Sequence, residues 1–294
     1  MSNVDASTWR ELVAETTELL GSRNEARWLC EEACGRFGAD FLEELDQPAT
    51  QRMGLSLRAM VGRRLAGEPL QYVLGHWPFR HIDLLVDPRV LIPRPETELV
   101  AEVAIGLARE AHGLRRSFDE VMRAADLGTG SGAIGLSMAN ELPTTGVEVW
   151  ITDMSDAALD VARANIAGIG RNAANVRVAH GNWCEALPND LRGCFDVIVA
   201  NPPYIAIDDN EVDEAVRQYE PHNALFADDQ GLADIFRIVD QSRDWLAATG
   251  WLVVEIGHRQ GDAVRAELVR LGFGSVDIRP DLAGRDRVAV AQRG

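Results

Sequence analysis

The second half of the chain alternates short apolar runs with segments of helical periodicity, and this rhythm constrains the fold more than any other feature. The apolar runs cover 123–127, 147–153, 176–181, 195–201 and 250–257, and the main helical segments cover 133–141, 155–168 and 231–247. Strands that alternate with helices build a parallel sheet with helices on both faces. Two final runs, 275–280 and 287–292, lie only six residues apart. Because that gap is too short for a helical crossover, we expect the last strand to be antiparallel.

The first part of the chain has a different pattern. Between residues 8 and 66 the apolar spacing is helical and is broken by short Gly, Asn or Pro interruptions, which predicts a small helical bundle. Residues 70–95 are rich in β-formers and hold four prolines, so a hairpin or extended connector is expected there rather than a helix. The predicted organisation is a helical domain at 1–75, a β-hairpin connector at 76–95 and an α/β domain at 96–294.

Charge and composition limit the classes of partner. All 29 basic residues are Arg, and against 46 acidic residues they leave a net charge of −17, which disfavours binding to a phosphate backbone. The N-terminus has no signal-peptide pattern and no apolar run is long enough to span a membrane, so a cytoplasmic protein is expected. A monomer is also expected. The four cysteines form no CxxC pair, and Cys30 and Cys34 are interpreted as packed helix residues rather than metal ligands. No metal site is predicted.

A glycine loop lies where the first predicted strand turns into its helix. Gly128, Gly130 and Gly132 alternate in this loop, and the missing Cβ atoms let a ligand approach backbone N–H groups at a helix N-terminus. Asp153 ends the second strand, where a carboxylate can accept both hydrogen bonds of a ribose diol. Loop and acid together predict an adenosine-bearing cofactor, either NAD or S-adenosylmethionine. Asp126 favours the latter, since it would repel a pyrophosphate but tolerate a sulfonium, unless it only caps nearby backbone donors.

The sequence NPPY directly follows the buried strand FDVIVA. Asn201 therefore emerges at the carboxyl end of the sheet, where open α/β folds bind ligands, and Pro202 and Pro203 fix a rigid bend. The amide oxygen of the Asn201 side chain and the backbone carbonyl of Pro202 could accept the two N–H groups of a planar nitrogen, with Tyr204 as an aromatic wall. The alternative is a strand-terminating turn in which Asn caps local backbone.

These features resemble class I S-adenosylmethionine-dependent methyltransferases that act on planar nitrogen, a group with a Rossmann-like doubly wound seven-stranded sheet. NPPY alone does not distinguish DNA, RNA and protein substrates. Four further stretches indicate the substrate class, because over essentially the whole chain they resemble the release factor glutamine methyltransferase family, PrmC/HemK. They are Glu68–Gly75 (EPLQYVLG), Val90–Val100 (VLIPRPETELV), Asp229–Leu232 (DQGL) and Asp281–Val288 (DLAGRDRV).

The resemblance implies methyl transfer from S-adenosylmethionine to the side-chain amide nitrogen of the glutamine in the GGQ motif of class 1 peptide chain release factors, which modulates translation termination. It implies a cofactor site made of Gly128, Thr129, Gly130, Ser131, Gly132, Asp153, Trp183 and Asn201. It implies substrate binding by Asn201, Pro202, Pro203 and Tyr204, with Asn201, Pro202 and Tyr204 catalytic. One departure is Asn182, where many relatives have Asp before the tryptophan, so cofactor affinity could differ.

Several assignments stay open at this point. Glu255 could line the methyl pocket or pair with an arginine, and Arg94 and Glu96 could contact ligand or pair structurally. The long connection from Ile205 to Asp229 is expected to help form the substrate mouth, and the helical domain is expected to recognise the partner. A nucleic-acid amino methyltransferase and a non-catalytic binding module remain the alternatives to this enzyme.

Overall fold

The structure is a computed structural model that describes residues 7–115, 120–209 and 212–294. Within these residues the chain divides into two compact units. The first ends at His76 and also includes helix α9 (Glu214–Tyr219), and the second comprises Trp77–Asp213 and Glu220–Gly294. The segment predicted as a connector thus belongs to the second unit from Trp77 onward.

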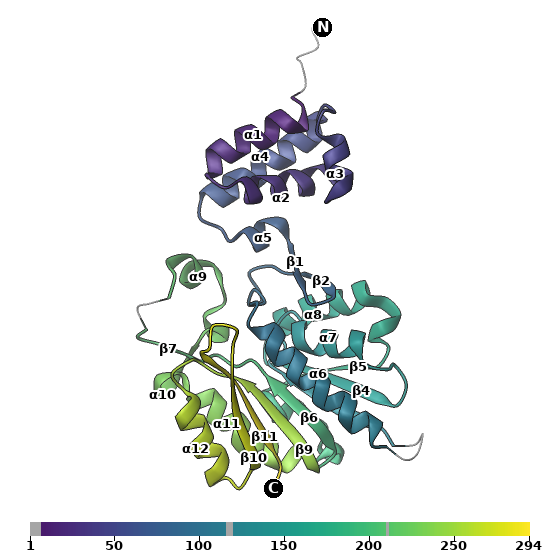
Figure 1. Ribbon diagram of the computed structural model, residues 1–294, viewed down its shortest axis with the longest axis vertical. Coiled ribbons are helices and arrows are strands. Elements are labelled where there is room, and N and C mark those ends of the chain that lie inside the picture. Colours follow the sequence, from purple (N-terminus) through teal and green to yellow (C-terminus); the bar gives the residue numbers. More distant parts are fainter. Residues whose placement is uncertain (1–6, 116–119, 210–211) are drawn as a thin grey trace. The chain divides into compact units, whose positions relative to one another are not determined.

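The first unit is a helical bundle (Figure 1). Its helices are α1 (Trp9–Leu20), α2 (Arg23–Cys34), α3 (Ala39–Glu44), α4 (Gln51–Leu65) and α5 (Leu70–Leu74). The side-chain hydroxyls of Thr8, Ser22 and Thr50 cap α1, α2 and α4 by accepting from backbone N–H groups, which satisfies donors that a helix start leaves unpaired. The buried core includes Trp9 and Phe41 in an edge-to-face contact.

Helix α5 lies where the sequence predicted extended chain, so the prediction for residues 70–74 was wrong. Pro69 precedes the helix at its N-cap, Gly75 ends it in the left-handed conformation at φ +83, and Leu70 and Val73 are buried in the bundle core. Proline is tolerated at a helix start, and tertiary burial here outweighs the strand propensity of the segment. The predicted hairpin begins directly after it, as β1 (His76–Phe79) and β2 (Ile82–Leu85).

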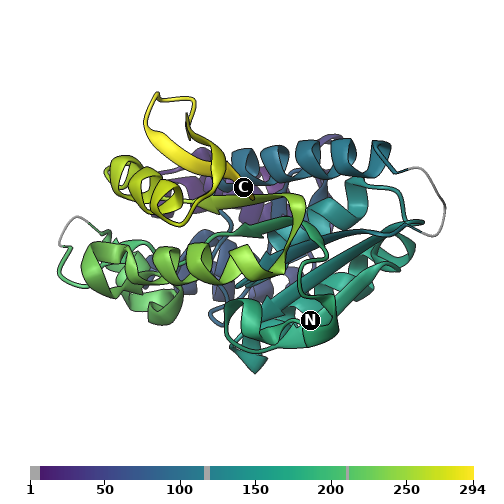
Figure 2. The ribbon, with the colours of Figure 1, turned by 90° about the horizontal axis from the view of Figure 1, so that it is seen from below.

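The second unit contains the predicted seven-stranded sheet, with helices on both faces (Figure 2). Its strands are β3 (Met122–Leu127), β4 (Val147–Asp153), β5 (Val176–His180), β6 (Phe195–Ala200), β9 (Leu246–Glu255), β10 (Gly274–Pro280) and β11 (Asp286–Gln292). The strand order is β10-β11-β9-β6-β3-β4-β5. Strand β11 is antiparallel to both β9 and β10, and the other pairs are parallel. The fold-class prediction, including the antiparallel last strand, is confirmed.

The helices of this unit are α6 (Thr97–Gly113), α7 (Ala133–Glu141), α8 (Asp156–Ile169), α10 (Asp228–Gly231), α11 (Ala233–Trp245) and α12 (Gly261–Arg270). Helix α6 packs on α7, and α11 packs on α12. The long connection after β6 contains a small parallel pair that the sequence did not predict, β7 (Ile205–Ala206) with β8 (Phe226–Ala227). Two-residue strands carry too little periodicity to be read from a sequence.

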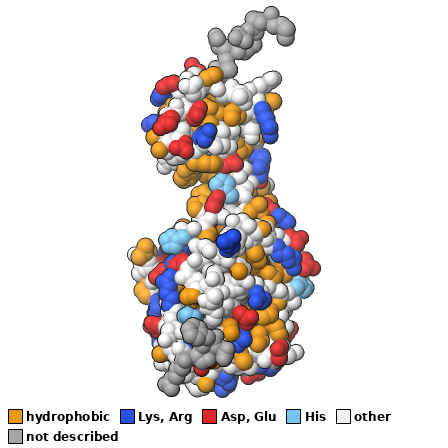
Figure 3. All heavy atoms as spheres, turned by 90° about the vertical axis from the view of Figure 1, so that its right-hand side faces the viewer, with side chains coloured by type: hydrophobic (Ala, Val, Ile, Leu, Met, Phe, Trp, Pro, Cys, Tyr) orange, Lys and Arg blue, Asp and Glu red, His pale blue; other side chains and the backbone are white. Residues whose placement is uncertain are grey.

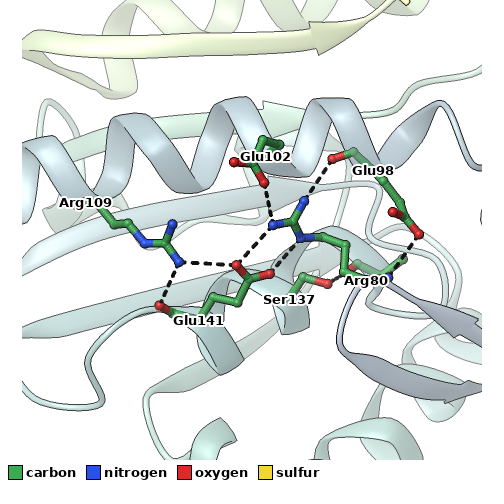
Figure 4. A network of polar contacts seen from close by, with 7 residues as sticks. Arg80, Glu98, Glu102, Arg109, Ser137 and Glu141 are labelled. Carbon is green, nitrogen blue, oxygen red and sulfur yellow. Dashed lines mark hydrogen bonds and ion pairs between the residues drawn. The ribbon is translucent and has the colours of Figure 1, made fainter. Parts of the chain in front are cut away.

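A polar network fixes the β1–β2 turn to α6 and α7 (Figure 4). The guanidinium of Arg80 donates two hydrogen bonds to Glu141, at 2.7 and 3.0 Å, and one to Glu102 at 2.6 Å. Arg109 contacts the same Glu141 carboxylate at 3.2 Å. Because the side chains of Arg80 and Glu141 are only 10% and 9% exposed, this pair is shielded from solvent and salt.

Charges elsewhere on the surface are mixed. On the face seen in Figure 3, acidic and basic side chains are interspersed on each unit. Among the described residues, no helix has both the length and the apolar composition needed to cross a bilayer.

Candidate active site

A cavity of about 360 Å³ lies at the carboxyl ends of the central strands and is lined by the glycine loop. Its volume is in the range of small-molecule sites, roughly 300–1,000 Å³. Eight of the residues proposed from the sequence line it: Gly128, Thr129, Gly130, Ser131, Asp153, Trp183, Asn201 and Pro203. Three proposed residues, Gly132, Pro202 and Tyr204, do not.

The glycine loop is shaped by close contacts as well as by backbone conformation. Gly128 has φ +69, and a Cβ added there would lie 2.8 Å from Cζ3 of Trp183. Gly132, at φ +90, is the N-cap of α7, and its Cβ would lie 2.7 Å from Cδ1 of Leu136. Gly128 thus lets the indole pack closely against the loop. Gly132 lets the helix begin, which explains its place outside the cavity lining.

Asp153 is held in place by backbone donors. One carboxylate oxygen accepts from the N–H of Gly130 at 2.9 Å and the other from the N–H of Ser155 at 2.9 Å. Burial raises the pKa of this carboxyl, and these backbone hydrogen bonds oppose the rise. Each oxygen keeps a further lone pair, so the fixed carboxylate can accept the two hydroxyls of a diol.

Asp126, by contrast, serves the loop itself. Its Oδ2 accepts from Thr129 Oγ1 at 2.5 Å and from the N–H of Gly135 at 2.8 Å. The side chain is almost fully buried, and burial raises its pKa to about 6. Asp126 thus caps local donors, as the alternative interpretation of the sequence held, while it also forms part of the cavity wall.

Trp183 lines the cavity and is anchored at its polar end. Its Nε1 donates to Oδ1 of Asp234 at 3.2 Å, and Asp234 also contacts Arg237 at 3.6 Å. Trp183 has φ +47, an uncommon conformation for a bulky residue. The ring is thus held by a side-chain anchor and by its contact with Gly128. Asn182, the departure noted in the sequence, lines the same cavity.

The NPPY turn begins at the end of β6. Asn201 Nδ2 donates to Thr97 Oγ1 at 3.3 Å, while Asn201 Oδ1 is buried and has no hydrogen-bond partner among the described residues. Tyr204 donates its hydroxyl to Glu255 Oε1 at 3.0 Å and packs against the core of the sheet. The backbone carbonyl of Tyr204 accepts from Gln260 Nε2 at 3.0 Å. The tyrosine therefore anchors the turn from behind, and the cavity takes its aromatic lining from Trp183 and Phe226 instead.

The sequence left the roles of three charged residues open, and each of them has a partner within the protein. These residues are Arg94, Glu96 and Glu255. Arg94 contacts Glu220 at 2.6 Å, and the side chain of Glu220 is only 1% exposed and also accepts from the N–H of Ile92 at 3.2 Å. Glu96 lies 3.9 Å from Arg285. Glu255 is fully buried on β9, receives the hydroxyl of Tyr204 and does not line the cavity.

Further cavity residues were missed in the sequence. Thr97 lies within the LIPRPETE stretch, so that motif was the available signal. Asn223 and Phe226 come from the long connection after β6, where only the length of the loop pointed to the site. Asp234 and Arg237 lie on α11 and resemble ordinary solvent-facing helix charges in the sequence. Among the residues that the structure describes, no group of three or more His, Cys, Asp or Glu could hold a metal ion.

The residues present fit S-adenosylmethionine. The fixed Asp153 carboxylate suits the ribose, the indole of Trp183 offers a planar apolar wall, and a side chain at Gly128 would close the space between loop and indole. At the end of β6, Asn201 brings a buried acceptor that no donor of the described residues satisfies. At a cavity wall, a ligand or an ordered water can satisfy such an acceptor.

Comparison with known proteins gives concordant matches. Residues 113–219 match the family model of the methyltransferase small domain, and residues 11–75 match that of the PrmC N-terminal domain. The release factor glutamine methyltransferase of Bordetella pertussis is 40% identical over 91% of this chain and 93% of that protein. The enzyme of the same name from Escherichia coli K12 is 33% identical over 96% of each protein. A solved METTL16 methyltransferase domain shares the fold, with a TM-score of 0.50 and 20% identity over 71% of this chain and 86% of that one.

Fold and cavity together define a methyltransferase of the S-adenosylmethionine-dependent class. The match to the PrmC N-terminal domain, and the identities above 30% over nearly the full length of the relatives, narrow the class to one family. The protein belongs to the release factor glutamine methyltransferase family.

Proposed function

We propose that this protein transfers a methyl group from S-adenosylmethionine to the side-chain amide nitrogen, N5, of the glutamine in the GGQ motif of class 1 peptide chain release factors. The observation that carries the proposal is the unpaired, buried Oδ1 of Asn201 at the wall of a cavity suited to an adenosine. An amide N–H is a donor that this acceptor lacks. The name shared by the family members supports the same substrate.

The residues of the chain would act mainly by positioning. Asn201 Oδ1, at the cavity wall, would accept one N–H of the substrate amide. The carbonyl of Pro202, a buried residue outside the cavity lining, would accept the other, and Pro202 and Pro203 would keep the two acceptors rigid. S-adenosylmethionine, when bound, supplies an electrophilic methyl group. As the N–C bond formed and the S–C bond broke, positive charge would develop on the amide nitrogen, and the two carbonyl dipoles would stabilise it more than they stabilise the neutral amide. S-adenosylhomocysteine would be the leaving group, and one N–H proton would pass to solvent.

The same arrangement gives selectivity for glutamine over glutamate. A carboxylate has no N–H pair and would bring a negative charge against two carbonyl dipoles. A site built around hydrogen bonds to its substrate rejects an analogue without them by roughly 10⁴-fold or more.

Within this proposal the remaining proposed site residues keep their roles. Gly128, Thr129, Gly130, Ser131 and Gly132 form and support the cofactor loop, Asp153 binds the ribose, and Trp183 lies against the adenine. Tyr204 supports the turn that carries Asn201. The helical domain at 1–75 would recognise the release factor, because an amide pocket alone cannot select one protein among many.

We further propose that the protein acts in the cytoplasm, where its substrates work, and that it acts as a monomer. It is also proposed not to bind nucleic acid directly. The net charge of −17 supports this last point, since it disfavours approach to a phosphate backbone. A nucleic-acid amino methyltransferase is the competing activity.

The two activities are separated by one labelling experiment. The protein is incubated with methyl-labelled S-adenosylmethionine and either a class 1 release factor or bulk RNA and DNA. Label is expected in the release factor only. Label in nucleic acid and none in the release factor would refute the proposal, and absence of cofactor binding by calorimetry would favour a non-catalytic module.

A further inference from the structure

The DQGL turn, Asp229–Leu232, lies outside the cavity lining, yet its backbone is unusual. Asp229 has φ +54 and Gln230 has φ +57, both in the left-handed region, and Gly231 follows at φ +83. Two successive residues with a Cβ rarely adopt this conformation, because it is strained for them. Their side chains are exposed, whereas Gly231 is buried. The turn therefore contributes its backbone path rather than its side chains.

This path brings the DQGL turn against the backbone of NPPY. A Cβ on Gly231 would lie 2.6 Å from the carbonyl carbon of Tyr204 and closer still to the carbonyl oxygen. Both atoms belong to the backbone, so they cannot move aside as the end of a flexible side chain can. Glycine is therefore required at position 231 for the close approach as well as for the positive φ.

The side chain of Gln260 joins the two turns. Its Nε2 donates to the backbone carbonyl of Tyr204 at 3.0 Å and to that of Gln230 at 3.2 Å. Its Oε1 accepts from the N–H of Gly257 at 2.8 Å. Gln260 is 8% exposed and does not line the cavity. Three backbone groups from three segments thus meet at one buried amide.

The orientation of the Gln260 amide follows from these partners. A backbone N–H can only donate, so the N–H of Gly257 must face Oε1. A backbone carbonyl can only accept, so the two carbonyls must face Nε2, whose two N–H groups match them in number. If the amide were turned over, all three contacts would join like groups.

These contacts fix the exit of the NPPY turn. Gln260 binds the carbonyl of the peptide unit between Tyr204 and Ile205. The N–H of the same unit, from Ile205, donates to the carbonyl of Leu225 at 3.1 Å. Both polar atoms of this peptide unit are therefore engaged, which restricts its rotation.

The two prolines transmit this restriction to the acceptors. Asn201 directly follows β6, so the sheet holds the start of the turn, and Gln260 holds its end. Between them the rings of Pro202 and Pro203 fix φ. Few torsions are left to absorb a rotation at Tyr204 without moving the carbonyl of Pro202.

We propose that Gln260 is a positioning residue that joins the NPPY turn to the left-handed DQGL turn and so sets the direction of the Pro202 carbonyl. That carbonyl is one of the two acceptors proposed for the substrate amide, so the catalytic consequence rests on the proposed function. The link between the two turns concerns this protein alone.

The kinetic test uses two variants that disturb the link differently. Gln260→Met keeps the approximate volume of the side chain and removes its hydrogen bonds, whereas Gly231→Ala displaces the Tyr204 carbonyl with Gln260 in place. We expect kcat to fall roughly ten- to a hundredfold in each, since a misplacement of about 1 Å can cost about 10²-fold. Cofactor Kd should stay unchanged, because neither residue lines the cavity. The two effects should be less than multiplicative when combined, because they act on one contact.

Matched controls separate positioning from general destabilisation. Gln292→Met removes another bond from a side-chain Nε2 to a backbone carbonyl, that of Thr249 at 3.2 Å. Because Gln292 pairs with Trp251 at the end of antiparallel β11, it lies at the edge of the sheet away from the cavity. Gly272→Ala adds a Cβ at another left-handed glycine, φ +79, where the nearest atom is the end of the Arg243 side chain at 3.9 Å.

Both controls should keep wild-type kcat, since neither touches the NPPY turn. Wild-type kcat in both Gln260→Met and Gly231→Ala would overturn the inference, as would an equal loss of kcat in the controls. If Gln260→Met fails to fold, Gly231→Ala decides alone against Gly272→Ala.

A second readout is independent of activity. The dipeptide Tyr-Ile occurs once in the chain, at 204–205. In protein with ¹³C-carbonyl tyrosine and ¹⁵N-isoleucine, the one directly coupled pair of labels is therefore the peptide unit that Gln260 binds. Its carbonyl signal should shift in Gln260→Met and Gly231→Ala, because the hydrogen bond to that carbonyl is lost or distorted, and should not shift in Gln292→Met or Gly272→Ala.

The two readouts distinguish failure of the link from failure of the proposed function. An unchanged carbonyl signal in Gln260→Met would refute the link. A protein whose variants give the expected shifts, but whose wild type places no methyl on a release factor, would refute the proposed function and leave the link supported.

Discussion

Arg80→Met removes one partner of a buried ion pair. We expect this change to destabilise the second unit far more than a change that removes one partner of an exposed ion pair with the same geometry. Arg80 contacts Glu141 through Nε at 2.7 Å and Nη2 at 3.0 Å. Arg270 contacts Glu267 through the same two nitrogens, at 2.7 and 2.5 Å. The arginine side chains differ in exposure, 10% for Arg80 and 65% for Arg270. Arg270→Met is therefore the matched control.

The expected magnitudes follow from burial. Removing one partner of a buried pair costs about 3–5 kcal/mol, because the other charge stays buried. Since Arg109 still contacts Glu141, we expect the lower end for Arg80→Met, about 3 kcal/mol. Exposed pairs contribute about 0–1 kcal/mol. In a unit of this size each kcal/mol shifts Tm by roughly 2–4 °C, so Arg80→Met should lower Tm by about 6–12 °C and Arg270→Met by at most about 4 °C.

Scanning calorimetry of the full-length protein provides the measurement, because it can resolve separate transitions for the two units. Arg80 lowers the pKa of Glu141, so this stabilisation is present above the unfolded pKa of the carboxyl and is lost as pH falls through the folded value. The Tm difference between wild type and Arg80→Met should therefore shrink in acid. Equal Tm losses for Arg80→Met and Arg270→Met at neutral pH would refute the argument from burial.

Three further variants test the site. Asn201→Ala leaves a substrate N–H unpaired at a cost of roughly 1–3 kcal/mol. The rate of methyl transfer should therefore fall about tenfold or more, while the cofactor Kd measured by calorimetry stays unchanged. Turnover at the wild-type rate would contradict the role of Asn201 as a substrate acceptor. Gly128→Ala places a Cβ 2.8 Å from the ring of Trp183, so cofactor affinity should drop on the order of tenfold, and an unchanged Kd would show that the indole contact is dispensable. Burial raises the pKa of Asp126 to about 6, so the folded state holds the proton of this carboxyl more tightly than the unfolded state does. The contribution of Asp126 to stability therefore declines as pH rises from about 4 to about 6. In Asp126→Asn, the free energy of unfolding measured with denaturant should lose this decline, and parallel curves of unfolding free energy against pH for the two proteins would contradict the prediction.

Much of the second unit could be predicted because its central strands, such as β3 and β6, are almost entirely buried. Strand β6 is apolar apart from Asp196, and the short gap before β11 required an antiparallel return. Helix α5 could not be predicted, because its five residues have strand-like composition and become helical only through burial of Leu70 and Val73 in the bundle core. Local propensity is a weak guide where tertiary contacts dominate.

The candidate site was predictable where backbone geometry favours one residue type, as at Gly128, and where a polar residue directly follows a buried strand, as at Asn201. The direction of the Tyr204 side chain was not, because an aromatic residue after two prolines can face either the ligand or the core. Its hydroxyl found a partner in Glu255, 51 residues away in the sequence. Long-range polar pairing of this kind leaves no local pattern.

Methylation of one glutamine is the central claim, and the most direct measurement locates the methyl group. A class 1 release factor is treated with the protein and S-adenosylmethionine, digested, and sequenced by tandem mass spectrometry beside a release factor in which the GGQ glutamine is replaced by glutamate. The account predicts one added methyl group on the glutamine side chain of the first protein and none on the second. Equal methylation of both release factors, or a methyl group located on another residue, would contradict it.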